Sequence, residues 1–208
     1  CTIPLNLPAS VAVAEALRTR AMWLLLFASS SQSLIGTALV FHQVSLFEEK
    51  GLDAGVAATV FTVMAPAVIV GSLIAGYLAD RLPNRNVLAA GQVLFALAMV
   101  LILVISAPWH AYAYGMVMGF GGGLIMTTNT VIWPNYFGRR YIGSIRGIAT
   151  TSMVGFAAIG PLPFAIVFDF TGSYTAAILM FLLLPASCTV AALLASPPRR
   201  LEPQPSSI

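Results

Sequence analysis

Six stretches of the sequence are each long and apolar enough to cross a lipid bilayer. A transmembrane helix needs about 20 consecutive, mostly apolar residues to cover about 30 Å of hydrocarbon. The segments between the stretches hold nearly all the charged residues, together with Pro, Gly and Asn. This pattern predicts an all-α membrane protein, a six-transmembrane-helix bundle over residues 21–195. The expected spans are 21–41, 56–78, 87–106, 111–132, 146–167 and 175–195.

The composition supports a chain that has almost nothing outside the bilayer. Hydrophobic residues make up 59% of the sequence and charged residues only 8%, whereas soluble domains carry about 25% charged residues. So few charges cannot cover a water-facing surface, and the remaining apolar area must contact lipid. The net charge of +3 does not indicate nucleic acid, because the ten basic residues form no single patch.

The basic residues divide unequally between the two sides of the predicted membrane. On one side of the predicted membrane, Lys50 is the single basic residue. The same side carries the acidic residues Glu48, Glu49, Asp53 and Asp169. Since basic loops stay in the cytoplasm, we expect both termini to be cytoplasmic and the protein to lie in the plasma (inner) membrane. Residues 1–20 then form a cytoplasmic N-terminal segment, and residues 196–208 a disordered cytoplasmic tail. The opposite side carries Arg18, Arg20, Arg81, Arg85, Arg139, Arg140, Arg146, Arg199 and Arg200.

Polar side chains are concentrated in two of the spans. The stretches 87–106 and 175–195 are nearly uniform hydrocarbon and are expected to face lipid, whereas 21–41 and 111–132 contain amides and hydroxyls. Because lipid offers no hydrogen-bonding partners, we predict that a substrate-binding cavity is lined by Gln32 and Asn129. Ser29, Ser33 and Thr37 share one helix face by four-residue spacing and are weaker candidates. The alternative to a role in the cavity is that these hydroxyls form hydrogen bonds within their own helix or to a neighbouring helix.

A charged turn lies between the second and third spans, in the sequence GYLADRLPNRN from Gly76 to Asn86. Asp80 would sit at the C-terminal end of a helix, where a carboxylate opposes the helix dipole. Arg81 and Arg85 are the adjacent cations that could compensate it. A solvated turn with arginines on the cytoplasmic side is the simpler interpretation.

This turn resembles the signature turn of the major facilitator superfamily. Pro83 and Asn84 depart from that pattern. Residues 15–20, 136–147 and 155–174 resemble the entry to the superfamily's seventh helix, the basic loop before its eleventh helix, and that helix with its following turn. The chain is thus similar to the C-terminal six-helix half, closest to the monocarboxylate and oxalate/formate branch. The matching residues of the turn are Gly76, Leu78, Ala79, Asp80, Arg81 and Arg85.

The resemblance implies a secondary active transporter, a symporter or antiporter that moves a small solute by alternating access. An organic anion such as a monocarboxylate is the implied solute, and Gly76, Asp80, Arg81 and Arg85 are implied to form a conformational-switch turn. The first and fourth spans would line the cavity, the third and sixth would face lipid, and the second and fifth would meet another half. That partner is either a missing N-terminal six-helix half or a second copy. The second and fifth spans carry no cation at mid-depth, so any positive charge for the solute would come from elsewhere.

Other classes of function find less support in the sequence. An intramembrane enzyme needs a paired nucleophile and base, or metal ligands, at membrane depth. His42 and His110 fall at the outer ends of spans and have no partner at ligand spacing. We therefore expect no enzyme activity, metal or cofactor. A membrane scaffold that does not transport remains the alternative.

Overall fold

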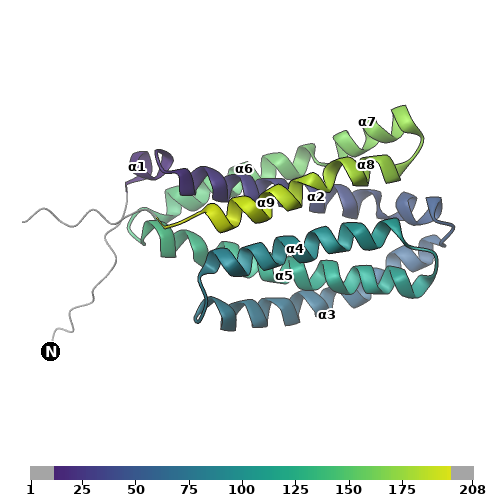
Figure 1. Ribbon diagram of the computed structural model, residues 1–208, viewed down its shortest axis with the longest axis horizontal. Helices are drawn as coiled ribbons and strands as arrows, with labels where there is room; N and C mark the ends of the chain where they lie inside the picture. The colour runs from purple at the N-terminus through teal and green to yellow at the C-terminus, as the bar shows by residue number, and fades with distance from the viewer. Residues whose placement is uncertain (1–11, 198–208) are drawn as a thin grey trace, which may run out of the picture.

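The computed structural model describes residues 12–197, which form a bundle of roughly parallel helical rods (Figure 1). Residues 1–11 and 198–208 lie outside the description, and with them most of the expected tail. The helices are α1 (Val13–Leu17), α2 (Arg20–Glu49), α3 (Ala54–Ala79), α4 (Asn84–Leu103), α5 (Pro108–Phe137), α6 (Ile142–Ile159), α7 (Pro161–Thr171), α8 (Tyr174–Phe181) and α9 (Leu183–Leu194).

Six membrane-spanning rods are present among the described residues, which confirms the predicted number. Four are single helices, α2 to α5, and the other two are the broken pairs α6–α7 and α8–α9. Both α2 and α5 have 30 residues, which at 1.5 Å per residue is about 45 Å. They therefore extend well beyond about 30 Å of hydrocarbon. Helix α5 begins at Pro108, a residue tolerated in a first turn because its missing N–H has no partner there.

Successive rods alternate in direction, so the turns gather at two ends of the bundle (Figure 1). The end that carries α1 and the end of α9 is on the left of the figure; we call it the arginine end, because Arg18, Arg20 and Arg81 lie in its segments. The other end, which we call the acidic end, holds the α2–α3 and α7–α8 turns with Glu49 and Asp53. The charge partition expected from the sequence therefore holds for the described residues, while Arg199 and Arg200 lie outside them.

Glycines bring α5 into very close contact with α3. Gly115, Gly119 and Gly123 recur at four-residue spacing on one face of α5. A Cβ atom at Gly119 would overlap the carbonyl oxygen of Met64, and one at Gly123 would overlap that of Val68. The two backbones are therefore as near as helices can pack, as small residues permit in membrane proteins.

The fifth rod breaks between α6 and α7, at the point where it packs against α2. Pro161 has no N–H to give to the Ala157 carbonyl, which instead accepts the N–H of Gly160 at 3.2 Å. A Cβ atom at Gly160 would overlap the carbonyl oxygen of Leu34 on α2. The break and the closest approach to α2 thus coincide.

The expectation that the most hydrocarbon-rich spans are the most exposed is only partly right. Half the residues in the most apolar part of α4 are buried, against 17% for α3 and 11% for α6–α7. Helix α4 exposes a stripe at Val93, Leu97 and Val100, while Phe95 and Met99 are buried. Hydropathy measures how apolar a helix is, but its burial depends on which neighbours cover its faces.

Candidate functional site

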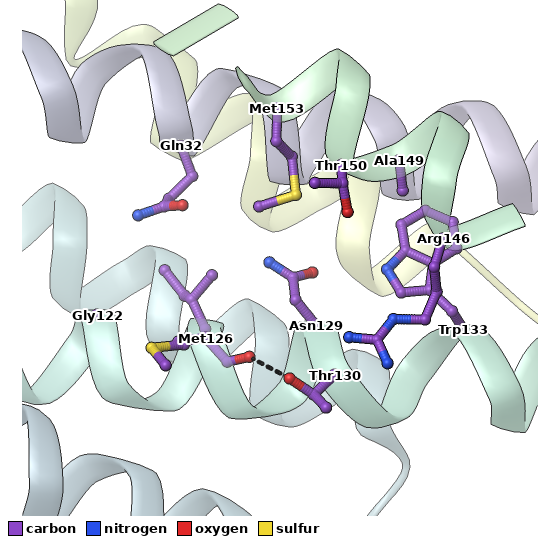
Figure 2. Close-up of a pocket in the computed structure, with 11 residues that line it drawn as sticks. Gln32, Gly122, Met126, Asn129, Thr130, Trp133, Arg146, Ala149, Thr150 and Met153 are labelled. Carbon is purple, nitrogen blue, oxygen red and sulfur yellow. Dashed lines mark hydrogen bonds between the residues drawn. The ribbon is translucent and has the colours of Figure 1, made fainter. Parts of the chain in front are cut away.

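A cavity of about 300 Å³ opens between α2, α5 and α6. Figure 2 shows polar side chains from all three helices arranged around it. Both amides predicted from the sequence, Gln32 and Asn129, are among its lining residues. The others are Gly122, Ile125, Met126, Thr130, Trp133, Arg146, Ala149, Thr150 and Met153.

Asn129 is held in place by a hydrogen bond from α2. The hydroxyl of Ser29, which is fully buried, donates to Asn129 Oδ1 at 2.8 Å. This bond uses the amide oxygen and leaves the amide nitrogen, which has no partner among the described residues. Asn129 is only 9% exposed, so an unused N–H donor lies at the cavity wall. A buried donor without a partner is costly, and a bound ligand would remove that cost.

Gln32 projects from α2 toward α5 across the cavity (Figure 2). Its side chain is half-buried, and no hydrogen bond joins it to another described residue. An amide carries two donor hydrogens and one acceptor oxygen. Gln32 can therefore serve a solute with either kind of group.

Arg146 is the first residue of the fifth span expected from the sequence, and it also falls within residues 136–147, the segment that resembles a basic loop. It lies in the second turn of α6, and its side chain lines the cavity opposite α5 (Figure 2). Helix α6 already begins at Ile142, so Arg146 lies in the helix, where its side chain is exposed and also lines the cavity. No carboxylate lines the cavity among the described residues. The sequence expectation concerned cations at mid-depth, whereas Arg146 reaches the cavity from near the arginine end of α6.

The three hydroxyls proposed beside Gln32 have different surroundings. Ser29 acts through Asn129, as described above. Ser33 and Thr37 are half-buried on α2 but do not line the cavity. The four-residue spacing does place the three hydroxyls on one face of α2, but the cavity ends before it reaches Ser33 and Thr37. Ser30, which was not singled out, bonds Ser152 of α6 at 2.8 Å and fixes the cavity wall to α2.

The charged turn lies at the arginine end, where α3 gives way to α4. Asp80 caps the end of α3 and is exposed, and Gly76 has open space around it. Arg81 stacks on the ring of Tyr77, 4.0 Å from its centroid. Arg85 donates to Ser196 Oγ at 3.1 Å. Neither arginine forms an ion pair with Asp80 within the described part of the chain.

Two buried glutamines that the sequence analysis did not single out join helices. Gln92 of α4 donates to the Ala28 carbonyl of α2 at 3.2 Å, and Gln43 of α2 donates to the Ala57 carbonyl of α3 at 2.8 Å. Gln92 is a polar residue inside an otherwise apolar span, and this contrast in the sequence could have identified it as a buried contact between helices. Both side chains are fully buried, so they hold the bundle together at a distance from the cavity.

The long apolar helices define the class of this molecule, an integral multi-pass membrane protein. Its sequence matches the family model of the Major Facilitator Superfamily over residues 17–207, and the chain belongs to that superfamily of transporters. No curated protein sequence matches it. The resemblance seen in the signature turn is thereby confirmed for the superfamily.

Proposed function

We propose that this secondary transporter moves a small organic anion such as a monocarboxylate. The observation that carries the proposal is the set of donors around the cavity: the Arg146 guanidinium, the free amide nitrogen of Asn129 and the amide of Gln32. A guanidinium matches a carboxylate with two parallel hydrogen bonds. The lining also includes apolar contacts from Ile125, Met126 and others, which suit a short carbon chain. This chemistry supports the monocarboxylate branch of the superfamily.

Transport would proceed by alternating access, in which two six-helix halves rock about a central site. The residues described here supply one half. Helices α3 and α6–α7 are the least buried rods, and the proposed occupant of their exposed faces is the other half, either an N-terminal six-helix unit or a second copy. The arginine end would face the cytoplasm of a cell whose plasma membrane holds the protein, with Asp80, Arg81 and Arg85 in a switch turn beside Gly76.

The test is uptake of radiolabelled monocarboxylates by the complete transporter in proteoliposomes. Arg146→Gln should raise the apparent KM by about tenfold or more, because a charged hydrogen bond contributes about 1.5–3 kcal/mol. Asn129→Ala should raise it less, since it removes a neutral donor. Arg139→Gln is the matched control, because Arg139 is an exposed arginine of the preceding turn and does not line the cavity.

Two results would count against the proposal. An unchanged KM in both cavity variants would show that these cavity residues do not bind the solute. A well-folded wild-type protein that moves no carboxylate, alone or with its other half, would favour a different solute or the non-transporting scaffold.

A further inference from the structure

A second cavity lies at the arginine end, between the start of α4, the end of α5 and the chain that leaves α9. Its volume is about 440 Å³, which is within the range of about 300–1,000 Å³ found for small-molecule sites. It shares no lining residue with the cavity between α2, α5 and α6, so it is a separate site. The polar side chains that line it are Asn84, Arg85, Asn135 and Tyr136.

Helix α4 begins at this cavity without a side-chain cap. Pro83 precedes the helix and offers no side-chain acceptor to the first backbone N–H groups. The Asn86 N–H bonds the Pro83 carbonyl at 2.8 Å, whereas the N–H groups of Asn84 and Arg85 have no hydrogen-bond partner in the described part of the chain. The free N–H groups at a helix start carry partial positive charge and bind phosphate readily.

The side chain of Asn84 is independent evidence for a ligand. It is only 6% exposed and lines the cavity, and no hydrogen bond joins its amide to another described residue. A buried amide without a partner is costly, because its two donor hydrogens and its oxygen lose their contacts with water. A ligand with acceptor oxygens would bond the amide hydrogens and remove part of that cost.

Arg85 brings a full positive charge to the same cavity. One of its N–H groups donates to Ser196 Oγ at 3.1 Å, which holds the guanidinium beside the chain that leaves α9. A guanidinium has five N–H donors, so others remain for a ligand. The cavity wall is fixed nearby, because the Tyr136 hydroxyl donates to the Ala195 carbonyl at 2.8 Å. Asn135, which is exposed, adds a second amide at the opening.

The charges around the cavity favour an anion. No carboxylate lines it among the described residues. Asp80 is the acidic residue of the α3–α4 turn, and it is exposed and points no group into the lining. The other charged residues of this turn and of the turn after α5 are Arg81, Arg139 and Arg140. The local potential is therefore positive, which attracts anions to this end of the bundle.

We propose that this second cavity binds a phosphate group, carried either by a soluble compound or by a lipid headgroup. The donors are the backbone N–H groups of Asn84 and Arg85, the Asn84 amide and the Arg85 guanidinium. A phosphate has enough oxygens to meet all of them, whereas a carboxylate has only two. The site is independent of the solute that the transporter moves. A bound phosphate would join the start of α4 to the chain after α9, which Arg85 already contacts.

The experiment measures binding to the purified complete protein in two arms. In the first arm, inorganic phosphate and glycerol 3-phosphate are titrated in neutral detergent, with sodium chloride keeping the ionic strength equal, and the thermal unfolding midpoint is followed. In the second arm, the protein is placed in phosphatidylcholine nanodiscs with added phosphatidylglycerol, and native mass spectrometry counts the phosphatidylglycerol molecules that stay bound. A response in the first arm alone identifies a soluble phosphate compound, and retention in the second arm alone identifies a lipid headgroup; either result supports the site when the variants below remove it.

Asn84→Asp is the sharpest variant, because it places a carboxylate where the phosphate would bind. Binding should fall below detection in both arms through like-charge repulsion. The unfolding temperature without phosphate should rise, since a carboxylate is favourable in the first turn of a helix. Arg85→Gln should weaken binding by about tenfold or more, because it removes a charged hydrogen bond. The matched controls are Asn86→Asp and Arg81→Gln, exposed positions that do not line the cavity.

Both controls should stay within about threefold of the wild type, because salt screens exposed charges. Absence of binding in both arms by the wild type would overturn the proposal. Wild-type affinity in Asn84→Asp would also overturn it, and so would an equal loss in Arg81→Gln, which would indicate a general attraction to the basic end. If Asn84→Asp does not fold, Arg85→Gln decides the question, and unchanged binding in that variant would contradict the site.

Discussion

Helices α5 and α6 both carry glycines separated by four or eight residues, but the two sets have different surroundings. On α5, the positions where Gly115, Gly119 and Gly123 would carry a side chain are occupied by the backbone and side chains of α3. On α6, Gly143, Gly147 and Gly155 have nothing within 4 Å. The same spacing therefore marks a completed helix contact in one rod and an open face in the other.

The difference separates two uses of small residues in a membrane. In α5 they allow backbones to touch, which stabilises the six-helix bundle itself. The α6 glycines contribute no such contact to the bundle, and each costs about 1 kcal/mol of helix propensity relative to alanine. A role outside the bundle would account for that cost, and an interface with the other half is the one we propose. The following substitutions test this comparison.

The largest effect is expected at the α3–α5 contact. Gly119→Leu would place a branched side chain where the Met64 carbonyl and the Ala67 side chain lie, and a backbone cannot move aside as a side chain can. Overpacking of this kind should destabilise the protein by about 3 kcal/mol or more. Thermal unfolding of the purified protein in detergent measures the loss. A stable Gly119→Leu protein would show that α3 and α5 can separate without cost.

A smaller effect is expected where α5 meets α4. A Cβ atom at Gly91 would lie 2.6 Å from Cγ1 of Ile125, a flexible side chain that can turn away, and 3.3 Å from the Gly121 carbonyl. Gly91→Ala should therefore cost about 1 kcal/mol, at the low end of overpacking. The same unfolding assay applies, and a loss as large as that of Gly119→Leu would mean that the α4 contact is equally rigid.

The smallest effect on stability is expected on α6. Gly155→Leu enters open space and should change the unfolding free energy of this bundle by less than about 0.5 kcal/mol. Transport by the complete protein should nevertheless fall, because the added side chain would obstruct the proposed interface. Unchanged transport would mean that this face of α6 contacts only lipid, and Gly147→Leu provides an independent repeat.

Most of the fold follows from residue patterns, because length and hydropathy determine which segments can span a bilayer. The candidate site was harder to predict from the sequence than the fold. Gln32 and Asn129 were found because amides are rare in lipid-facing helices, but Arg146 was missed because its direction depends on where α6 begins. That start is set by a short turn after Gly138, whose φ of 79° is left-handed.

The relation between Gln32 and the hydroxyls shows the same limit. Four-residue spacing correctly placed Ser29, Ser33 and Thr37 on one face of α2. It could not show that Ser29 would be used to orient Asn129, since that depends on how α5 is placed by its glycine contacts with α3 and α4. Tertiary packing decides which member of a polar face reaches the cavity.

The hydrogen bonds at the arginine end also set a practical boundary for protein engineering. The Tyr136 hydroxyl donates to the Ala195 carbonyl at 2.8 Å, and Arg85 donates to Ser196. Together they fasten the chain just after α9 to the turn that begins α4 and to the end of α5. A shortened or tagged version should therefore retain Ser196 and place its fusion point later.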